Sequence, residues 1–234
     1  MTRHELFPAC IIHRRDYRNT SLLLELFTPH EGRLPAIAKG AKSTRSNRSA
    51  LLQPFMPLLV TLSGRGEIKQ LIHVEPEGRP LSLTQEKLYC GFYLNELLMR
   101  LLERKDPFPA LYVHYVHTLE RLASHESADQ CLREFELALL HELGYGLLLD
   151  RTADTGEPVI AEESYHYVVE QGPYKVSDTQ VEDLLHGRTL LHLHNRKNLD
   201  EQGVAEAKRL MRRILAFYLG DKPLKSRELF QGLK

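Results

Sequence analysis

Five short apolar runs separated by turns fill the first 76 residues, and no other feature of the chain restricts its fold as much. The runs span residues 7–15, 20–29, 32–40, 55–62 and 67–76, and the turns PHEGR and SGRG each contain glycine. Glycine accommodates the positive φ angles of tight hairpin turns. The run at 20–27, taken alone, also suits a helical turn, because short apolar runs are ambiguous by period. Together the five runs predict a small closed barrel, for which the five-stranded OB-fold is a common solution.

The pattern changes to helical spacing after residue 83. The segment EPEGRPLSL, with two prolines and a glycine, is typical of a linker. Beyond it, apolar residues recur three and four positions apart, as on one face of a helix. Residues 150–177 are irregular, with a minor hairpin expected over 165–177. Helices are expected over 84–106, 107–123, 128–143, 200–219 and 226–233. We therefore predict an α+β chain, with the barrel in residues 1–80 and an all-α helical domain in residues 81–234.

The composition is that of an ordinary soluble globular protein, with 42% hydrophobic and 26% charged residues in a chain of 234. No apolar run approaches the ~18 residues that a membrane span needs, and the N-terminus lacks the apolar region of a signal peptide. Cys10, Cys90 and Cys131 stand alone without a CxxC pair. That spacing argues against a disulfide framework or a thiolate metal site, and a reducing cytoplasm is the expected location.

The charge is balanced over the whole chain but not along it. Residues 1–80 carry 12 Lys and Arg against 7 Asp and Glu, and residues 208–234 carry 8 against 2. Between them, residues 81–207 carry 11 Lys and Arg against 22 Asp and Glu. A polyanionic partner is therefore expected to meet the two ends of the chain and to avoid its acidic middle.

A basic arm, AKGAKSTRSNRS at residues 38–49, lies between the third and fourth expected strands. It contains Lys39, Lys42, Arg45 and Arg48 and no acidic residue. Composition alone allows either a solvated loop or a loop whose cations bind phosphates and release counterions from a nucleic acid. Context favours phosphate binding, because more cations fall at ends and turns of the same strands. These are Arg14, Arg15, Arg18, Arg33, Arg65 and Lys69. Aromatic residues are few in this region, so binding is expected to be led by charge and weakly selective for sequence.

Signals for catalysis or for a metal are weak. His186, His192 and His194 are close in sequence, but no carboxylate or cysteine cluster completes a coordination sphere. The sequence contains no GxxxxGK[ST] nucleotide loop and no GxSxG nucleophile elbow. Glu134 and Glu136 fall on different faces of their expected helix, so they do not form a carboxylate pair for acid–base catalysis. We expect a protein that is not an enzyme and that uses no metal or cofactor.

Arg133 is a cation flanked by acidic residues in the expected helix 128–143. Its spacing favours an ion pair three or four residues away, with Glu136 or a neighbouring acidic residue. The apolar stripe of that helix is more typical of a core-facing surface than of a ligand groove.

Eight short motifs, in order and at compatible spacing, resemble the RecO family of bacterial recombination mediator and DNA repair proteins. They extend over most of the chain, and their order and spacing carry the resemblance rather than any single motif. They are TSLLLELFT (20–28), GRL…AKGAK (32–42), LQPFMPLLV (52–60), GRGEIK (64–69), LYCGFYLNELL (88–98), FELALLHELGYG (135–146), GEPV (156–159) and KPLKSREL (222–229).

The resemblance implies an N-terminal OB-fold followed by an all-helical domain, acting without nucleotide hydrolysis. RecO-like proteins bind single- and double-stranded DNA and anneal complementary strands. With RecR they help to load RecA onto DNA covered by single-stranded DNA-binding protein (SSB). Carried over to this sequence, the DNA surface of the barrel comprises Arg14, Arg33, Lys39, Lys42, Arg45, Arg48, Arg65 and Lys69.

The same resemblance implies that the helical domain takes the acidic, Phe-ending C-terminal tail of SSB. Arg133 then becomes a candidate for the terminal carboxylate of the tail, and Leu132 a candidate for the pocket of its Phe. A guanidinium suits this role because it can bond both carboxylate oxygens at once.

The sequence departs from the family pattern at one point. Many RecO-like proteins carry four cysteines as a zinc site in the helical domain, whereas the corresponding residues 147–167 contain none. We expect a zinc-free, cytoplasmic and nucleoid-associated mediator of DNA repair and recombination, with no membrane partner. The rival interpretations are a protein-interaction adaptor that does not bind DNA directly and, with less support, a metal-dependent nuclease that uses the histidines.

Overall fold

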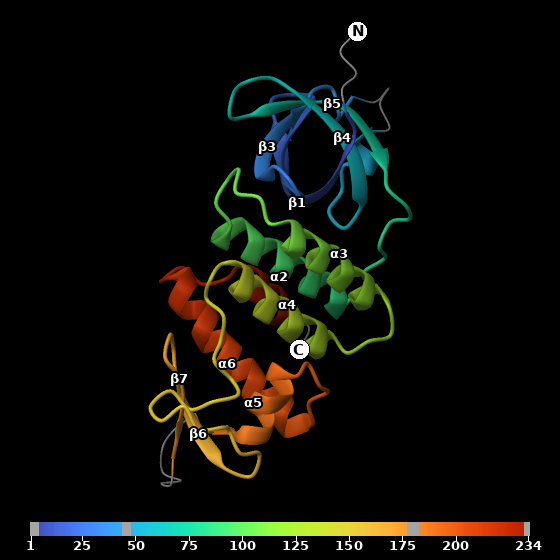
Figure 1. Cartoon of the computed structure of the whole chain (residues 1–234). Helices are drawn as coiled ribbons and strands as arrows, with labels where there is room; N and C mark the ends of the chain where they lie inside the picture. The colour runs from blue at the N-terminus through green and yellow to red at the C-terminus, as the bar shows by residue number, and fades with distance from the viewer. Residues whose placement is uncertain (1–4, 44–47, 177–182, 232–234) are drawn as a thin grey trace. The chain divides into compact units, whose positions relative to one another are not determined.

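The computed structural model describes residues 5–43, 48–176 and 183–231 (Figure 1). The chain forms two compact units, one of residues 1–125 with 224–234 and the other of residues 126–223. Each unit is described by itself below, as unit 1 and unit 2. The change from strands to helices near residue 80 lies inside unit 1.

Unit 1 contains a closed barrel of five strands in the order β1-β2-β3-β5-β4. The strands are β1 (Phe7–Tyr17), β2 (Ser21–Thr28), β3 (Gly32–Ala38), β4 (Pro57–Ser63) and β5 (Lys69–Pro76). Neighbouring strands are antiparallel except β3 and β5, which are parallel. β1 closes the barrel by pairing with both β2 and β4, and register shifts interrupt its pairing with β2 and that of β4 with β5. Such bulges help a sheet to bend into a barrel. The predicted five-stranded OB-like barrel is confirmed.

The barrel is filled by alternate side chains of its strands, as period-2 patterning requires. Leu22, Leu24 and Leu26 of β2 are buried in this core, together with Ile11 of β1 and Leu34 of β3. β2 is buried along its whole length, so its outward-facing side chains are covered as well.

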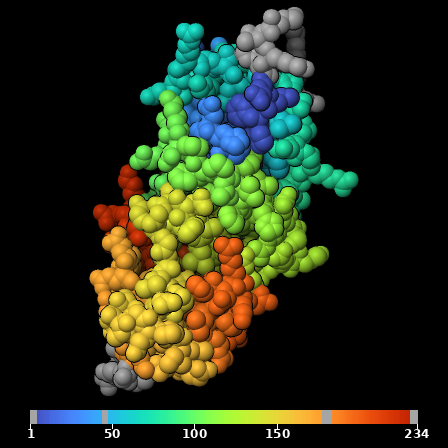
Figure 2. All heavy atoms as spheres, viewed as in Figure 1, coloured from blue at the N-terminus to red at the C-terminus, as the bar shows by residue number. Residues whose placement is uncertain are grey.

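The helix α3 (Pro109–Ala123) supplies part of that cover, and α2 (Glu86–Leu101) packs against β1. The ring of Phe27 on β2 lies 5.5 Å from the ring of Tyr112 and 5.9 Å from that of Tyr115, both on α3. The Tyr115 hydroxyl donates to Asn95 Oδ1 of α2 at 2.6 Å, which satisfies two buried polar groups between the helices. Figure 2 shows the barrel strands and these helices as one continuous packed surface.

The loop between α2 and α3 is fixed to the barrel at Gly32. This glycine has φ of 62°, and a Cβ atom there would lie 2.1 Å from the carbonyl oxygen of Asp106. The backbone N–H of Lys105 donates to the carbonyl of Arg33 at 3.0 Å. Only glycine fits the close approach of the two backbones at this point.

Two short helices complete unit 1: α1 (Arg48–Leu51) and α7 (Ser226–Gln231). Glu96 of α2 accepts hydrogen bonds from the backbone N–H groups of Lys225 (2.9 Å) and Ser226 (2.8 Å). These bonds attach the C-terminal segment to α2. Burial alone would raise the pKa of the Glu96 carboxyl, but the bonds from Ser226 and Lys225 outweigh it and hold the pKa below its ordinary value.

Unit 2 contains α4 (Ala128–Glu142), α5 (Gly187–His194), α6 (Glu201–Leu219) and a small antiparallel sheet. The sheet consists of β6 (Ser164–Val168), β7 (Gly172–Lys175) and β8 (Leu185–His186). The predicted helices at 128–143 and 200–219 are confirmed by α4 and α6. The minor hairpin expected over 165–177 is confirmed by β6 and β7, although residue 177 lies outside the described residues. The helical expectation for this part of the chain included neither β8 nor α5.

Candidate nucleic-acid interface

Three connections that carry cations meet at one end of the barrel. β2 begins opposite the end of β3, since Leu22 pairs with Ala38, and the N–H of Lys42 donates to the carbonyl of Thr20 at 2.9 Å. β5 begins beside β3, where Gln70 pairs with Ile37, and the end of β4 pairs with the same Gln70 through Ser63. The β1–β2 turn, the start of the basic arm and the β4–β5 loop therefore share this end. We call it the cationic end and define it by Arg18, Lys39, Lys42, Arg65 and Lys69.

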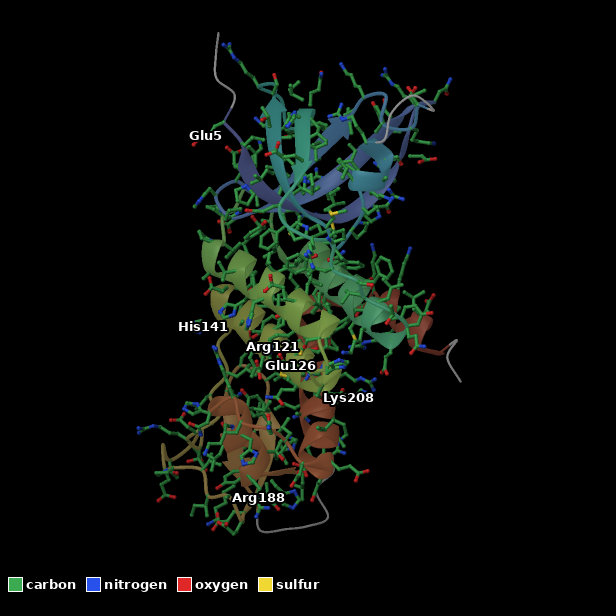
Figure 3. All side chains as sticks on the ribbon, turned by 90° about the vertical axis from the view of Figure 1, so that its right-hand side faces the viewer. Glu5, Arg121, Glu126, His141, Arg188 and Lys208 are labelled. Carbon is green, nitrogen blue, oxygen red and sulfur yellow. The ribbon has the colours of Figure 1, made fainter. Side chains whose placement is uncertain are left out.

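Most side chains of the cationic end are open to solvent. Arg18, Lys39, Lys42 and Arg65 are exposed, and Figure 3 shows nitrogen-tipped side chains that project from the upper part of the barrel. Lys42 Nζ pairs with Asp16 Oδ2 at 2.5 Å, and Lys69 Nζ donates to the carbonyl of Gly64 at 3.0 Å. Both acceptors are themselves at the surface, so either bond can be exchanged for a phosphate at small cost.

Two other cations of the predicted DNA surface, Arg45 and Arg48, are not among the residues that define the cationic end. Arg45 lies outside the described residues. Arg48, at the start of α1, donates through Nη2 to the carbonyl of Ile72 on β5 at 3.2 Å and is half-buried.

Arg14 and Arg33 are engaged inside unit 1. Arg14 Nη1 donates to the carbonyl of Leu52 at 2.8 Å, which fastens the chain where it returns from the basic arm to the barrel. The Arg33 side chain is 14% exposed and lies 3.7 Å from the Glu25 carboxylate. Burial lowers the pKa of Arg33, and the charge of Glu25 opposes that effect. Their predicted DNA contacts stay predictions, with less structural support than those of the exposed cations.

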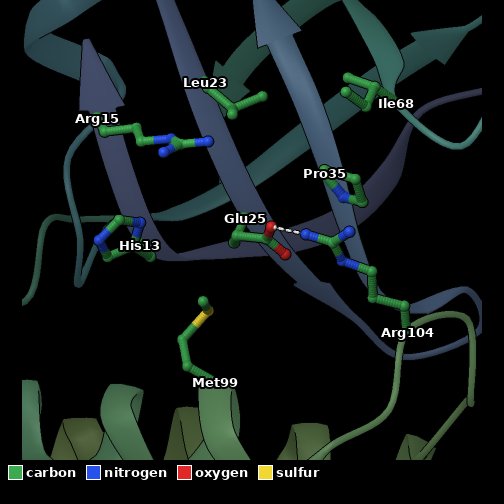
Figure 4. Close-up of a pocket in the computed structure, with 8 residues that line it drawn as sticks. All are labelled: His13, Arg15, Leu23, Glu25, Pro35, Ile68, Met99 and Arg104. Atoms are coloured by element: carbon green, nitrogen blue, oxygen red, sulfur yellow. Dashed lines mark hydrogen bonds and ion pairs between the residues drawn. The ribbon is translucent and has the colours of Figure 1, made fainter. Parts of the chain in front are cut away.

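The outer face of β1, β2 and β3 carries a pocket of about 380 Å³ next to the cationic end (Figure 4). The register places Arg15 beside Leu23, and His13 beside Glu25. Pro35 of β3 follows Glu25 in the same row. Ile68 of the β4–β5 loop, Met99 of α2 and Arg104 of the α2–α3 loop complete the lining.

Glu25 is the central charged group of this pocket. Its side chain is 9% exposed, and Arg104 Nη2 donates to its Oε1 at 2.5 Å. Glu25 and Arg104 are 79 positions apart in the chain, and the parallel bridge between Arg33 and Arg104 brings them together. Sequence reasoning missed His13, Glu25, Met99 and Arg104, because only tertiary packing makes them neighbours.

In unit 2, Arg133 and Leu132 are both buried on α4. Arg133 Nη2 donates to Glu136 Oε1 at 2.7 Å, and the two side chains are 8% and 0% exposed. Of the pairs three or four residues apart that the spacing favoured, the structure shows the one with Glu136. The assignment of Arg133 and Leu132 to an SSB tail stays a prediction.

The three histidines considered for a metal site lie on β8 and α5 of unit 2. His192 and His194 lie on α5, and His192 Nδ1 is 2.8 Å from the carbonyl of Asn198. His186 Nδ1 is 2.6 Å from the buried Glu206 carboxylate. Among the described residues there is no group of three or more His, Cys, Asp or Glu side chains placed to hold a metal ion. None of the described helices is long and apolar enough to cross a membrane.

Comparison with known proteins gives matches along nearly the whole chain. The family model of the Recombination protein O N terminal matches residues 1–78, and that of the Recombination protein O C terminal matches residues 83–228. A solved Entamoeba histolytica asparaginyl-tRNA synthetase has a TM-score of 0.27 at 14% identity, over 77% of this chain and 41% of that one. So low a score carries no argument about the fold.

Similar proteins named DNA repair protein RecO occur in several bacteria. The one from Methylococcus capsulatus is 52% identical over 224 residues, which cover 96% of this chain and 92% of that protein. The one from Nitrosococcus oceani is 47% identical over 98% of this chain and 94% of its own length. A Coxiella burnetii protein of this name is 44% identical over 97% of this chain and 98% of its own. With both family models matched in order, and relatives of this similarity aligned over more than nine tenths of both chains, the chain belongs to the RecO family.

Proposed function

We propose that this chain is a non-enzymatic mediator of DNA repair and recombination, which binds single- and double-stranded DNA and anneals complementary strands. The observation that carries the proposal is the convergence of three cation-bearing connections at one end of an OB-like barrel. Loops between the first two and last two strands are a common binding region of OB-folds. The names of the relatives, DNA repair protein RecO, support the same process.

Annealing by such a surface requires no nucleotide. Two complementary strands repel each other through their phosphates, and exposed Lys and Arg side chains lower that repulsion while counterions are released. The segments 13–20, 38–43 and 63–70 together contain seven Lys and Arg residues and only two Asp and Glu residues. Their net positive charge favours the binding of phosphates. The role of the protein is then to hold two strands close enough to pair.

Binding should therefore depend steeply on salt. For four phosphates neutralised on a single strand, the slope of log K against log salt is about −2.8, which is a loss of roughly 50-fold between 50 and 200 mM. An affinity that is unchanged over this range would contradict phosphate neutralisation.

We further propose that unit 2 binds the C-terminal tail of SSB and that the protein acts with RecR to assist RecA loading. Support for these partners comes from membership of the RecO family. Arg133→Ala should weaken tail binding and spare binding of naked DNA. Because Arg133 is paired with a buried carboxylate, the matched variant is Arg133→Met with Glu136→Leu, which removes both charges and retains apolar volume. Equal loss of tail and DNA binding in that variant would contradict separate sites.

The alternative is a protein-interaction adaptor that does not bind DNA directly. One observation favours it: Lys42 and Arg48 of the basic arm already have partners within unit 1. Charge reversal of Lys39, Lys42, Arg45 and Arg48 separates the two functions. A DNA-binding mediator would lose affinity for oligonucleotides, whereas an adaptor would keep its protein partners and show no change with DNA.

A further inference from the structure

We infer that the pocket on the outer face of β1, β2 and β3 binds one unstacked nucleotide of a single strand, and that Glu25 selects a base with an exocyclic amino group. The inference rests on the proposed DNA-binding function and deepens it, since charge alone would leave the protein indifferent to base identity. A cavity of about 380 Å³ is within the range of small-ligand sites.

The pocket adjoins the cationic end, so a bound strand can reach it without a break. Arg15 lies near the β1–β2 turn. Tyr17 pairs with Ser21 at the end of the hairpin, and Arg15, two residues before Tyr17, pairs with Leu23. Its side chain is exposed, and within the described residues it makes no ion pair. A guanidinium in this position suits the phosphate of the nucleotide that enters the pocket.

The walls of the pocket suit the flat faces of a base. Leu23, Pro35 and Met99 give apolar surface, and the exposed imidazole of His13 gives a ring for stacking. Ile68 is 48% exposed in the β4–β5 loop at the rim. A large apolar side chain so open to water gains little in folding, whereas it would be covered by a stacked base.

Glu25 provides the polar discrimination. A carboxylate offers about four acceptor positions and no donor. In the described residues Glu25 accepts one hydrogen bond, from Arg104, while its buried Oε2 has no hydrogen-bond partner and lies 3.7 Å from Arg33 Nη1. Figure 4 shows Glu25 between His13 and Arg104, with its carboxylate directed towards Arg104. The amino group of cytosine can donate to this carboxylate, whereas the O4 atom of uracil or thymine is an acceptor and would oppose it.

The test compares oligo(dC) and oligo(dU) 12-mers, which differ at each base in an amino group against a carbonyl. Fluorescence anisotropy with the full chain should give an affinity about tenfold higher for dC, in the lower part of the range for a base contact. Glu25→Gln, which keeps the shape but adds a donor, should bring the two affinities within about twofold. Ile68→Ser should weaken both oligonucleotides and keep the preference for dC.

Equal affinity of the wild-type protein for dC and dU would overturn the inference while leaving the proposed DNA binding intact. A tenfold preference that survives Glu25→Gln would also overturn it. Binding of neither oligonucleotide would refute the proposed function itself. Independently of any variant, photo-crosslinking with 5-iododeoxycytidine should label peptides that contain His13 or Met99, and crosslinks confined to unit 2 would contradict the pocket.

Discussion

Replacement of Gly32 by alanine tests how firmly the α2–α3 loop is attached to the barrel. Alanine at φ of 62° costs about 1–2 kcal/mol in the left-handed region. The new Cβ would lie 2.1 Å from the Asp106 carbonyl oxygen, so one backbone must move, at the ~1–3 kcal/mol typical of overpacking. That movement also breaks the bond from Lys105 N–H to the Arg33 carbonyl, worth about 1 kcal/mol. We expect the free energy of unfolding to fall by about 3–6 kcal/mol.

Gly40→Ala is the matched control. Gly40 has φ of 65°, nearly that of Gly32, but nothing lies within 4 Å of the added Cβ. Its unfolding free energy should fall by only about 1–2 kcal/mol. Urea unfolding followed by circular dichroism measures both variants. Values for Gly32→Ala and Gly40→Ala within about 1 kcal/mol of each other would refute the close approach of the two backbones.

Three further outcomes follow from single contacts. Arg133→Ala should lower the free energy of unfolding by about 3–5 kcal/mol, because the buried Glu136 loses its ion pair, and an unchanged urea midpoint would contradict this. Arg14→Ala should cost about 1–2 kcal/mol through its bond to Leu52, yet reduce DNA affinity less than Lys39→Ala in parallel titrations. For Glu206, burial would raise the pKa, but bonds from Thr189 and His186 outweigh it and the pKa lies below 4.5. Its contribution to stability is therefore present above pH 4.5 and lost as the pH falls through the folded-state pKa, so Glu206→Gln should flatten the acid limb of a stability–pH profile.

The barrel was predictable because its signals are local. Alternating apolar residues and glycine turns specify each strand, and Leu22, Leu24 and Leu26 can point inward together only if β2 is extended. The closure of the barrel, through the pairing of β1 with β4, was predicted from the number of strands and not from any single residue. The cover of β2 by α3 was not predictable, since a fully apolar strand shows only that both faces are buried and not what buries them.

The parts of unit 2 that were missed have weak local signals. β8 has two residues, too few for any alternation, and α5 begins directly after it. Residues two apart, such as His192 and His194, can share a ligand only on a strand face, whereas α5 places them on different sides of a helix. Gly187 is the first residue of α5, directly after β8. A Cβ atom there would lie 1.9 Å from the carbonyl oxygen of Ile160, a close approach that the sequence alone does not indicate.

The candidate interface was predictable where it consists of exposed loop cations and not where it depends on tertiary contacts. Lys39 and Arg65 lie on the surface, as their loop positions indicate. Arg14 and Arg33 have the same charge but point to partners in unit 1, and sequence spacing does not distinguish the two cases. Glu25 and Arg104 pair only because the α2–α3 loop packs against the barrel. No local sequence pattern predicts a contact between residues 79 positions apart.

The most direct test of the central claim is annealing of complementary SSB-coated oligonucleotides in the absence of ATP. The variant replaces Lys39, Lys42 and Arg65 of the cationic end by alanine, and the control replaces Arg188, Arg196 and Lys197, three exposed cations of unit 2. We predict annealing by the wild-type protein without nucleotide, a rate at least tenfold lower for the cationic-end variant, and little change for the control. Equal rates for the wild-type protein and the cationic-end variant would contradict the account.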